Sequence, residues 1–545
     1  MRILAERLAD SGLPTLRFDY HGTVDSPGYD DDPDRVSTWL GNIRNAITWM
    51  RQTTGVEEIA LIGLRLGATM AAIVASEQTG IKRLALLAPP TSGRAYTREV
   101  QLSGRVMVPI GADGLEREAP SDSITMAGFK LTNQTISDLR GIDVLKLKTA
   151  PASYVLILQS EGRPGEDAVA KHLEHLGASV TKRSFRDYQR MISDPTDSRP
   201  CLETIDAVVR WMNEDAPSLA CSRQTQITPM VIRDEQWTEE ALRFGADDRM
   251  VGILCHPARP APGQPCIAIG NTGRDYHIGW ARSTVLLARH LANHGIASLR
   301  FDLPGIGDSL AVKPRRLASL YKKKTAVHLS VAIDVLEKRG FELIYLYGRC
   351  SGAYNAFQAA QRDTRVRRLI LCNIQRYVWR IGDAIEFAYV DSIHLLRQPL
   401  GKVVFGAGKA STRLSDRVRT NCIRVLMACF RTARDIIIWG ARKSVAIYND
   451  GPGLVSWVRN FTGHGGRMLF VYSSNDLGFP HFEKLFGKNG AHIRDVPGVS
   501  IQFVEGADHN FTEPHMQRHF ERIITEFVLD NSNKPPLDMV RPESV

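Results

Sequence analysis

The sequence predicts a doubly wound α/β fold that occurs twice in tandem. Residues 4–26 (LAERLADSGLPTLRFDYHGTVDS) recur as residues 287–309 (LARHLANHGIASLRFDLPGIGDS). Residues 59–68 (IALIGLRLGA) recur at nearly the same offset as residues 344–353 (IYLYGRCSGA). Repetition of this kind indicates one architecture used twice. Because strand and helix patterns alternate in both copies, we expect mostly parallel sheets with helices on both faces.

The elements of each copy follow in the same order. In the first block, a helical pattern ends at Gly12 or Gly295, since glycine tolerates the positive φ of a helix C-terminus. A short apolar strand then leads into Arg-Phe-Asp and a glycine-containing loop. In the second block, a buried-strand pattern enters a G-x-X-x-G turn and an alanine-rich helix. A helix at residues 205–212 closes the first copy.

The chain divides into two predicted domains, residues 1–214 and 227–545, joined by a polar linker at 215–226. The second domain opens with three strands, at 239–245, 250–257 and 266–271. The first copy has no equivalent of these strands and begins at the repeated helix. Either the gene start is placed too late or the domain is naturally truncated. In the latter case its sheet exposes an edge or borrows a strand.

Composition is that of a globular protein, with 43% hydrophobic and 23% charged residues. The sequence contains no apolar run long enough to span a membrane and no secretory signal in its first ten residues, so a cytoplasmic location is expected. Eight cysteines lack CxxC pairs and metal-ligand spacing. We therefore expect no disulfide framework, no metal site and no cofactor.

The net charge of +10 raises the question of anionic partners. Much of the excess falls within residues 376–443, which form either a solvated helical face or an electropositive rim over a pocket for an anionic substrate. Nucleic acid is not an expected partner, because the sequence has no nucleic-acid motif and no aromatic residues interleaved with the basic ones. The sequence does not indicate an oligomeric state.

The turn Gly348-Arg349-Cys350-Ser351-Gly352 has the form of a nucleophile elbow, in which the central residue is held in a strained conformation between small neighbours. This predicts Cys350 as a nucleophile exposed at the N-terminus of a helix, whose dipole favours the thiolate. The alternatives are a buried cysteine without reactivity and, ranked below Cys350, Ser351 as the nucleophile.

An acid and a base follow the elbow in the order nucleophile, acid, base. Asp476 comes after the apolar strand at residues 468–472, and His509 lies in the loop after the strand at residues 500–504. The alternative is a capping aspartate and a surface histidine. The oxyanion hole is expected from the backbone N–H of Ser351 and from that of Thr272 or Gly273.

The first copy lacks this set. Its elbow has Arg65 in the central position, and a guanidinium stays protonated and cannot act as a nucleophile. The acid region survives loosely at residues 159–161, and no histidine follows the later strand. This copy is predicted to be non-catalytic, with Arg65 binding an anion or pairing with an internal carboxylate.

The repeated R-F-D-x-x-G-x-x-D-S block, the elbow and the Asp/His pair resemble the α/β-hydrolase superfamily, in its serine-aminopeptidase-like branch, over nearly the whole chain. The G-L-R-L-G-A elbow is similar to hydrolase-like proteins that accompany bacterial exosortase and exopolysaccharide loci. The G-R-C-S-G box resembles the cysteine boxes of polyhydroxyalkanoate synthases and dienelactone hydrolases. The resemblance implies two tandem α/β-hydrolase domains and a helical lid at about residues 375–465, including Trp379, Trp439 and Trp457.

The expected function is that of a hydrolase or acyltransferase acting on an ester or thioester through Cys350, His509 and Asp476, in bacterial exopolysaccharide metabolism. Its partner would be a small-molecule, glycan or acyl substrate. The alternative is a non-catalytic binding or scaffold protein built from two pseudo-hydrolase domains. Retention of glycines, thiol, acid and base in the second copy favours the enzyme.

Overall fold

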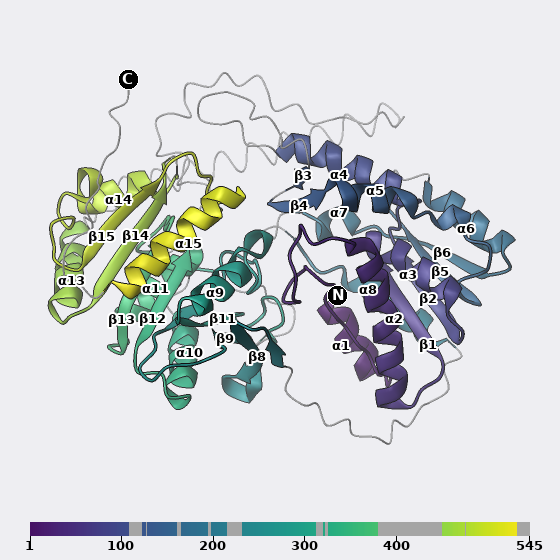
Figure 1. The fold of residues 1–545 in the computed structure, drawn as a ribbon, viewed down its shortest axis with the longest axis horizontal. Helices are drawn as coiled ribbons and strands as arrows, with labels where there is room; N and C mark the ends of the chain where they lie inside the picture. Colours follow the sequence, from purple (N-terminus) through teal and green to yellow (C-terminus); the bar gives the residue numbers. More distant parts are fainter. Residues whose placement is uncertain are drawn as a thin grey trace, which may run out of the picture.

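Two β-sheets organise the chain, one in each half (Figure 1). The structure is a computed structural model that describes residues 1–107, 123–126, 128–160, 165–193, 198–214, 231–311, 320–321, 325–379, 450–474 and 476–530. The second half (residues 231–530) holds a large mixed sheet, and the first half (residues 1–214) holds a separate small parallel sheet. The protein is therefore of the α/β class.

The small sheet has the strand order β1-β2-β5-β6, and every pairing in it is parallel. Its strands are β1 (Ile59–Leu64), β2 (Ile81–Leu87), β5 (Tyr154–Gln159) and β6 (Ser179–Ser184). The helices of this half are α1 (Arg2–Asp10), α2 (Arg35–Thr54), α3 (Leu66–Glu77), α4 (Gly93–Met107), α5 (Asn133–Gly141), α6 (Gly165–His175), α7 (Tyr188–Met191) and α8 (Leu202–Asn213). A hairpin, β3 (Ser123–Met126) with β4 (Phe129–Thr132), lies apart from this sheet.

Successive side chains along each strand point to opposite faces of the small sheet, so its apolar side chains are divided between the two faces. Leu84 and Leu86 of β2 pack with α2, α3 and α6, while Ala85 and Leu87 pack with α1 and α8. Both faces of the sheet are therefore covered, as doubly wound folds require.

The large sheet has the order β15-β14-β13-β12-β10-β11-β9-β8-β7. Strand β9 runs antiparallel to β8 and β11, β7 runs antiparallel to β8, and the strands from β11 to β15 pair in parallel. The strands are β7 (Val231–Arg233), β8 (Trp237–Phe244), β9 (Met250–Pro257), β10 (Cys266–Ile269), β11 (Ala297–Phe301), β12 (Ile344–Arg349), β13 (Val366–Cys372), β14 (Arg467–Ser473) and β15 (Val499–Val504). The three opening strands predicted from the sequence correspond to β8, β9 and β10, and the short β7 was not predicted.

Helices cover both faces of the large sheet (Figure 1). They are α9 (Ser283–Asn293), α10 (Val327–Lys338), α11 (Ser351–Ala360), α13 (Gly451–Gly463), α14 (Phe479–Phe486) and α15 (Pro514–Leu529). Cys266 and Ala268 of β10 belong to the core cluster on the side of α10 and α11. Ile267 and Ile269 belong to the cluster on the side of α9 and α15.

Helix α13 corrects the predicted extent of the lid. Leu454 and Val458 belong to the core of the large sheet, and the Trp457 ring packs 4.8 Å from that of Phe357. The end of the predicted insertion at 375–465 is therefore part of the helical layer. Most of the remaining insertion, with Trp439, lies outside the described residues, as does the predicted linker at 215–226.

The repeated Arg-Phe-Asp blocks contact each other across the two halves. Arg17 Nη2 lies 2.6 Å from Asp308 Oδ1, and Arg300 Nη2 lies 2.9 Å from Asp25 Oδ1. Arg17 and Arg300 hold the same position in the repeated block, as do Asp25 and Asp308, so the contact is reciprocal. The two pairs differ in burial, because Arg300 is fully buried while the Arg17 side chain is 42% exposed.

Further basic side chains of the second half hold the loop that carries Asp25. Arg282, which is buried, donates hydrogen bonds of 2.9–3.1 Å to four backbone carbonyls of that loop. Arg289 Nη2 donates to the Asp25 carbonyl at 2.7 Å, and His277 Nε2 lies 2.6 Å from Asp25 Oδ2. We call Asp25, His277, Arg282, Arg289 and Arg300 the inter-half clamp.

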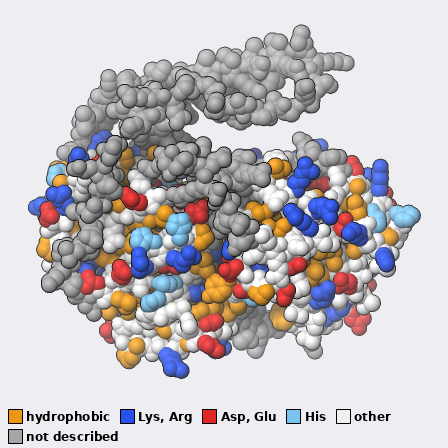
Figure 2. All heavy atoms as spheres, turned by 45° about the horizontal axis from the view of Figure 1, so that its top comes forward, with side chains coloured by type: hydrophobic (Ala, Val, Ile, Leu, Met, Phe, Trp, Pro, Cys, Tyr) orange, Lys and Arg blue, Asp and Glu red, His pale blue; other side chains and the backbone are white. Residues whose placement is uncertain are grey.

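The surface of both halves carries charges of both signs. Figure 2 shows Lys and Arg side chains interspersed with Asp and Glu over each half. The predicted basic stretch at 376–443 lies almost entirely outside the described residues. None of the helices in the described ranges is both long and apolar enough to cross a membrane.

Candidate active site

Cys350 lies in the sharp turn between β12 and α11. Its backbone has φ 54° and ψ −119°, a conformation that L-residues rarely adopt. A Cβ on Gly348 would collide with the backbone of Gly352, so the two flanking glycines permit this close approach. The turn leaves the Cys350 side chain partly exposed, at the carboxyl end of the sheet and at a helix N-terminus.

Asp476 and His509 come together beside this cysteine. Asp476 follows β14, and its carboxylate accepts the Gly478 N–H at 2.7 Å and faces His509 Nδ1 at 2.5 Å. This bond leaves the other ring nitrogen of His509 for the hydrogen bond that it makes with Cys350. The Asp476 side chain is 1% exposed and that of His509 is 32% exposed. The structure thus joins the three residues in one hydrogen-bonded chain.

The electrostatics of this chain favour a charged cysteine–histidine pair. Burial would raise the pKa of Cys350, but its hydrogen bond and charge interaction with His509 outweigh burial and lower that pKa below the ordinary value of 9.0. Burial would lower the pKa of His509, but hydrogen bonds to Asp476 and Cys350 raise it to about 10. At neutral pH both shifts favour a thiolate beside an imidazolium.

Two further side chains, Asn373 and Arg349, position the histidine loop. Asn373, after β13, donates to the His509 carbonyl at 2.8 Å and accepts the Ser473 N–H at 2.9 Å. Arg349 is buried and donates to the Asn510 carbonyl at 2.7 Å. The loops that carry acid and base are therefore tied to the strands next to the elbow.

The predicted oxyanion donors lie in two segments that contact each other. The Ser351 N–H hydrogen-bonds to Cys350, and the Ser351 hydroxyl accepts the Gly273 N–H at 2.8 Å. The Gly273 N–H is thus engaged with the Ser351 hydroxyl. In the described part of the chain, no group accepts a hydrogen bond from the Thr272 N–H. The Ser351 hydroxyl faces this loop, which does not favour Ser351 as the nucleophile.

The loop that carries Thr272 is anchored at both ends to Asp302. Asn271 Nδ2 donates to Asp302 Oδ1 at 2.8 Å, and His277 Nδ1 lies 2.8 Å from Asp302 Oδ2. The second ring nitrogen of His277 meets Asp25 of the first half. Burial opposes a charged His277, but these two carboxylates raise its pKa to about 10. The inter-half clamp therefore reaches the predicted oxyanion loop.

Tyr321 is a further neighbour of the thiol that the sequence did not indicate. Its hydroxyl lies 3.6 Å from Cys350 Sγ, and its ring stacks on Trp379 with centroids 4.3 Å apart. Trp379 belongs to the start of the predicted lid. No motif marks this tyrosine in the sequence, because it reaches Cys350 from another part of the chain.

The elbow of the first half has the same backbone with different chemistry. Arg65 has φ 55° and ψ −125°, close to the values of Cys350. Its guanidinium pairs with Glu99 Oε2 at 2.5 Å and donates to the Ala88 carbonyl at 3.2 Å. Of the two roles considered for Arg65, the structure has the internal carboxylate pair.

Among the residues that the structure describes, no cluster of three or more His, Cys, Asp or Glu side chains is arranged to hold a metal ion.

A scan against protein-family models gives no match, and a search of curated proteins gives none either. Solved structures show distant similarity. They include Est1E from Butyrivibrio proteoclasticus (16% identity, 53% of this chain and 97% of that chain, TM-score 0.30) and an esterase from Pyrococcus furiosus (11%, 55% and 98%, TM-score 0.33). An alpha-beta serine hydrolase homologue from Coxiella burnetii also matches (12%, 56% and 99%, TM-score 0.30). Each similarity covers about half of this chain.

Proposed function

We propose that this chain is an acyl-transferring enzyme, an esterase, thioesterase or acyltransferase, whose nucleophile is Cys350. The observation that carries the proposal is the hydrogen-bonded chain of Cys350, His509 and Asp476 at a strained strand–helix turn. A nucleophile, a base in contact with it and a third group orienting the base form the arrangement required for covalent catalysis.

The proposed fold is a pair of α/β-hydrolase domains, of which only the second is catalytic. In the large sheet, the nucleophile, acid and base follow β12, β14 and β15, which agrees with the order expected for this fold. In the first half, β1 and α3 enclose an elbow with the same dihedral angles. Arg65 and Glu99 fill its centre with an ion pair, which supports a non-catalytic role for this half.

In the proposed mechanism, the Cys350 thiolate attacks the carbonyl carbon of an ester or thioester. A C–S bond forms, and the carbonyl oxygen becomes an oxyanion held by the backbone N–H groups of Ser351 and Thr272. When the tetrahedral intermediate collapses, the bond to the leaving group breaks and His509 donates a proton to that group. Asp476 holds the imidazole in the orientation and charge state that this transfer needs.

The acyl-enzyme is a thioester, and its fate decides the enzyme class. His509, now neutral, removes a proton from water or from an alcohol, whose oxygen attacks the thioester carbonyl and releases Cys350. Water gives hydrolysis, and an alcohol gives acyl transfer. Exchange between a thioester donor and the thiol is nearly thermoneutral, which favours thioesters as acyl donors.

The test is selective labelling of the thiol. The second-order rate of alkylation by iodoacetamide at pH 7 is measured by mass spectrometry for the wild type, Cys350→Ala and His509→Ala. We expect rapid modification at Cys350 in the wild type and a slowing of about 10-fold or more in His509→Ala, because the thiolate loses its counter-ion. Cys372 is fully buried and serves as the internal control.

A second assay follows release of the thiol product from short acyl thioesters. Loss of this activity in Cys350→Ala, and a decrease of about 10²–10⁴-fold in His509→Ala, would support the proposal. If Cys350 is alkylated no faster than an ordinary thiol and His509 has no influence, the proposal is overturned and the chain is better described as a binding protein.

A further inference from the structure

The sulfur of Cys350 accepts hydrogen bonds from the His509 ring, the Ser351 N–H and the Tyr321 hydroxyl, whose oxygen lies 3.6 Å from Sγ. A thiolate carries no proton, so the tyrosine hydroxyl is the donor whenever Cys350 is charged. Burial raises the pKa of Cys350, whereas His509 and, after it, Tyr321 lower this pKa. The tyrosine therefore favours the charged form of the thiol.

Of these donors, Tyr321 is the one without a second task in the mechanism proposed above. His509 gives its proton to the leaving group, and the Ser351 N–H turns to the oxyanion. The Tyr321 hydroxyl has no other acceptor in that mechanism. It therefore stays with the sulfur both when the thiolate attacks and when it leaves.

Tyr321 is held by the helix that begins directly after Cys350. The carbonyl of Leu320 accepts a hydrogen bond from Asn355 Nδ2 of α11 at 3.2 Å. The Tyr321 ring packs on Tyr354 of α11 with centroids 5.3 Å apart, and only 5% of Tyr321 is exposed. Because both anchors follow the cysteine on one rigid helix, the hydroxyl is fixed relative to Sγ.

Trp379 adds a stacked contact to this tyrosine. The two rings lie 4.3 Å apart between centroids and 15° from parallel. Offset or stacked aromatic pairs have a preferred geometry, so the indole limits the positions that the tyrosine ring can adopt.

The first half lacks both helix anchors of the tyrosine. In the aligned elbows, Thr69 and Met70 stand where the second half has Tyr354 and Asn355. The Thr69 hydroxyl donates to the Pro90 carbonyl at 3.0 Å instead. The anchors thus occur in the copy whose elbow has a thiol, which supports a role at the sulfur over a general role in this fold.

We propose that Tyr321 is a catalytic residue whose hydroxyl donates a hydrogen bond to the Cys350 thiolate, and that Trp379 positions it. The proposal rests on the acyl-transfer function proposed above. In the attack, the C–S bond forms and the sulfur loses its negative charge. When the acyl-enzyme is resolved, this bond breaks and the hydroxyl again meets a thiolate. No proton leaves the hydroxyl in either step.

The experiment uses the full chain and Tyr321→Phe, which keeps the ring and removes the donor. The rate of Cys350 alkylation by iodoacetamide is measured by mass spectrometry from about pH 5 to about pH 9. On the acidic side of the lower inflection, we expect the rate to fall by about 3-fold or more, because less of the thiol is ionised. On the plateau, the rate should rise by about 2- to 3-fold, because a thiolate with fewer donors is a stronger nucleophile.

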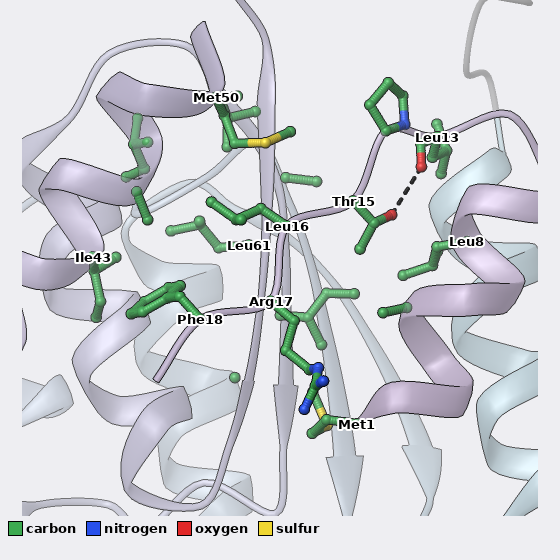
Figure 3. Close-up of a pocket in the computed structure, with 18 of the residues that line it drawn as sticks. Met1, Leu8, Leu13, Thr15, Leu16, Arg17, Phe18, Ile43, Met50 and Leu61 are labelled. Atoms are coloured by element: carbon green, nitrogen blue, oxygen red, sulfur yellow. Dashed lines mark hydrogen bonds between the residues drawn. The ribbon is translucent and has the colours of Figure 1, made fainter. Parts of the chain in front are cut away.

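The matched control is Tyr20→Phe, which also removes one tyrosine hydroxyl. Tyr20 lines an apolar cavity of about 470 Å³, and Figure 3 shows Ile43 and Met50 of α2 on one side of this cavity and Leu8 of α1 on the other. The described residues that line the cavity all lie within residues 1–212, in the first half. The alkylation profile of this variant should therefore superpose on that of the wild type.

Trp379→Leu tests the positioning role, because it keeps the hydroxyl and removes the stacked ring. We expect the lower inflection to move in the same direction as in Tyr321→Phe, by a smaller amount. In the double variant, Trp379→Leu should add nothing to the effect of Tyr321→Phe, since the donor that it positions is already absent. An additional shift in the double variant would overturn the role of Trp379.

A Tyr321→Phe profile that superposes on the wild type, while His509→Ala still slows alkylation, overturns the inference and leaves the proposed function standing. Absence of any dependence on His509 overturns both. A uniform decrease across the pH range, with the inflection unmoved, identifies a structural role for Tyr321 and also overturns the inference, as does an equal shift in Tyr20→Phe.

Discussion

At the residue scale, Cys350 and Arg65 show how neighbours decide the chemistry of one backbone conformation. Their φ and ψ values differ by 1° and 6° (54° and −119° against 55° and −125°). Cys350 faces His509, whereas Arg65 pairs with Glu99 and packs over the Tyr188 ring at 5.9 Å. The strained turn therefore only holds the side chain of its central residue. That side chain becomes reactive only where a base lies beside it.

The first prediction concerns the pH dependence of the thiol. The pKa of Cys350 is lowered and that of His509 is raised to about 10, so thiolate and imidazolium coexist between these two values. The rate of Cys350 alkylation by iodoacetamide should rise at a pH below 9.0 as the thiolate forms, and then remain on a plateau. It should change again near pH 10, where His509 loses its proton. Asp476→Asn removes the carboxylate that raises the His509 pKa, so the upper change should move to lower pH. Alkylation that rises only near pH 9 in both proteins would contradict this account.

The proposed nucleophile, acid and base of the candidate site could be predicted from the sequence. The residues that contact and position them could not. Cys350, Asp476 and His509 each follow a strand in a fixed order, which is a local signal. Asn373 and Tyr321 act through contacts across elements far apart in the chain. Such contacts depend on how the strands are ordered in the sheet, and no single segment of sequence records them.

At the element scale, the loop from Asn271 to His277 is held against the start of α11. Gly352 lies under this loop, and a Cβ there would meet the Asn271 carbonyl oxygen at 2.6 Å. The equivalent Gly67 has room, since its Cβ would meet only the Tyr20 hydroxyl, at 3.8 Å. The two helices thus differ in what lies above their first turn.

This difference gives a matched pair of substitutions. Gly352→Ala should push the Asn271 loop away and misplace the Thr272 N–H, decreasing thioester turnover by about 10²-fold while Cys350 alkylation persists. Gly67→Ala should leave turnover unchanged and alter the free energy of unfolding by less than about 1 kcal/mol. Turnover assays and urea unfolding of both variants check this. Equal turnover in the two variants would remove this loop from the proposed mechanism.

The alternation of strand and helix patterns predicts most helices and strands. The structure differs from this prediction where an element's partners, and not its own sequence, decide what it forms. The pattern at residues 14–18 matches β11, yet this segment is not a strand, because no β10 equivalent lies between it and β1 in the described structure. The sequence pattern places helix α13 in a lid, because its amphipathic pattern does not reveal that its apolar face packs on the large sheet. Local patterns predict the type of an element better than its partners.

At the scale of the whole molecule, the inter-half clamp is a buried charge network. Arg300 contacts Asp25 and Glu239, and His277 lies between Asp25 and Asp302. Removing one member of such a network leaves the others as uncompensated buried charges. The clamp therefore couples the stability of the two halves.

We predict that Asp25→Asn decreases the free energy of unfolding by about 3–5 kcal/mol. Asp308→Asn, at the same position of the repeated block, removes a partly exposed pair and should cost about 1 kcal/mol or less. Urea unfolding at pH 7 measures both. Thioester turnover should also fall in Asp25→Asn, because His277 anchors the oxyanion loop. Similar losses in the two variants would contradict the difference in burial.

The same network predicts how the stability of the folded protein changes with pH. The pKa of His277 is about 10 in the folded protein against 6.5 ordinarily, so its contribution to stability is complete below pH 6.5 and is lost as the pH rises towards 10. Asp25→Asn removes one of the two carboxylates that raise this pKa. The loss of stability between pH 7 and 9.5 should therefore be smaller in Asp25→Asn than in the wild type.

The reciprocal pairs Arg17–Asp308 and Arg300–Asp25 have the form of an isologous contact, in which each partner offers the same patch to the other. Here both partners belong to one polypeptide, so their effective concentration is fixed by the chain and does not fall on dilution. In a homodimer, any substitution in the patch would appear on both sides of the symmetry axis. In this chain each side can change alone, as one buried and one exposed ion pair, and one thiol and one guanidinium elbow, already illustrate.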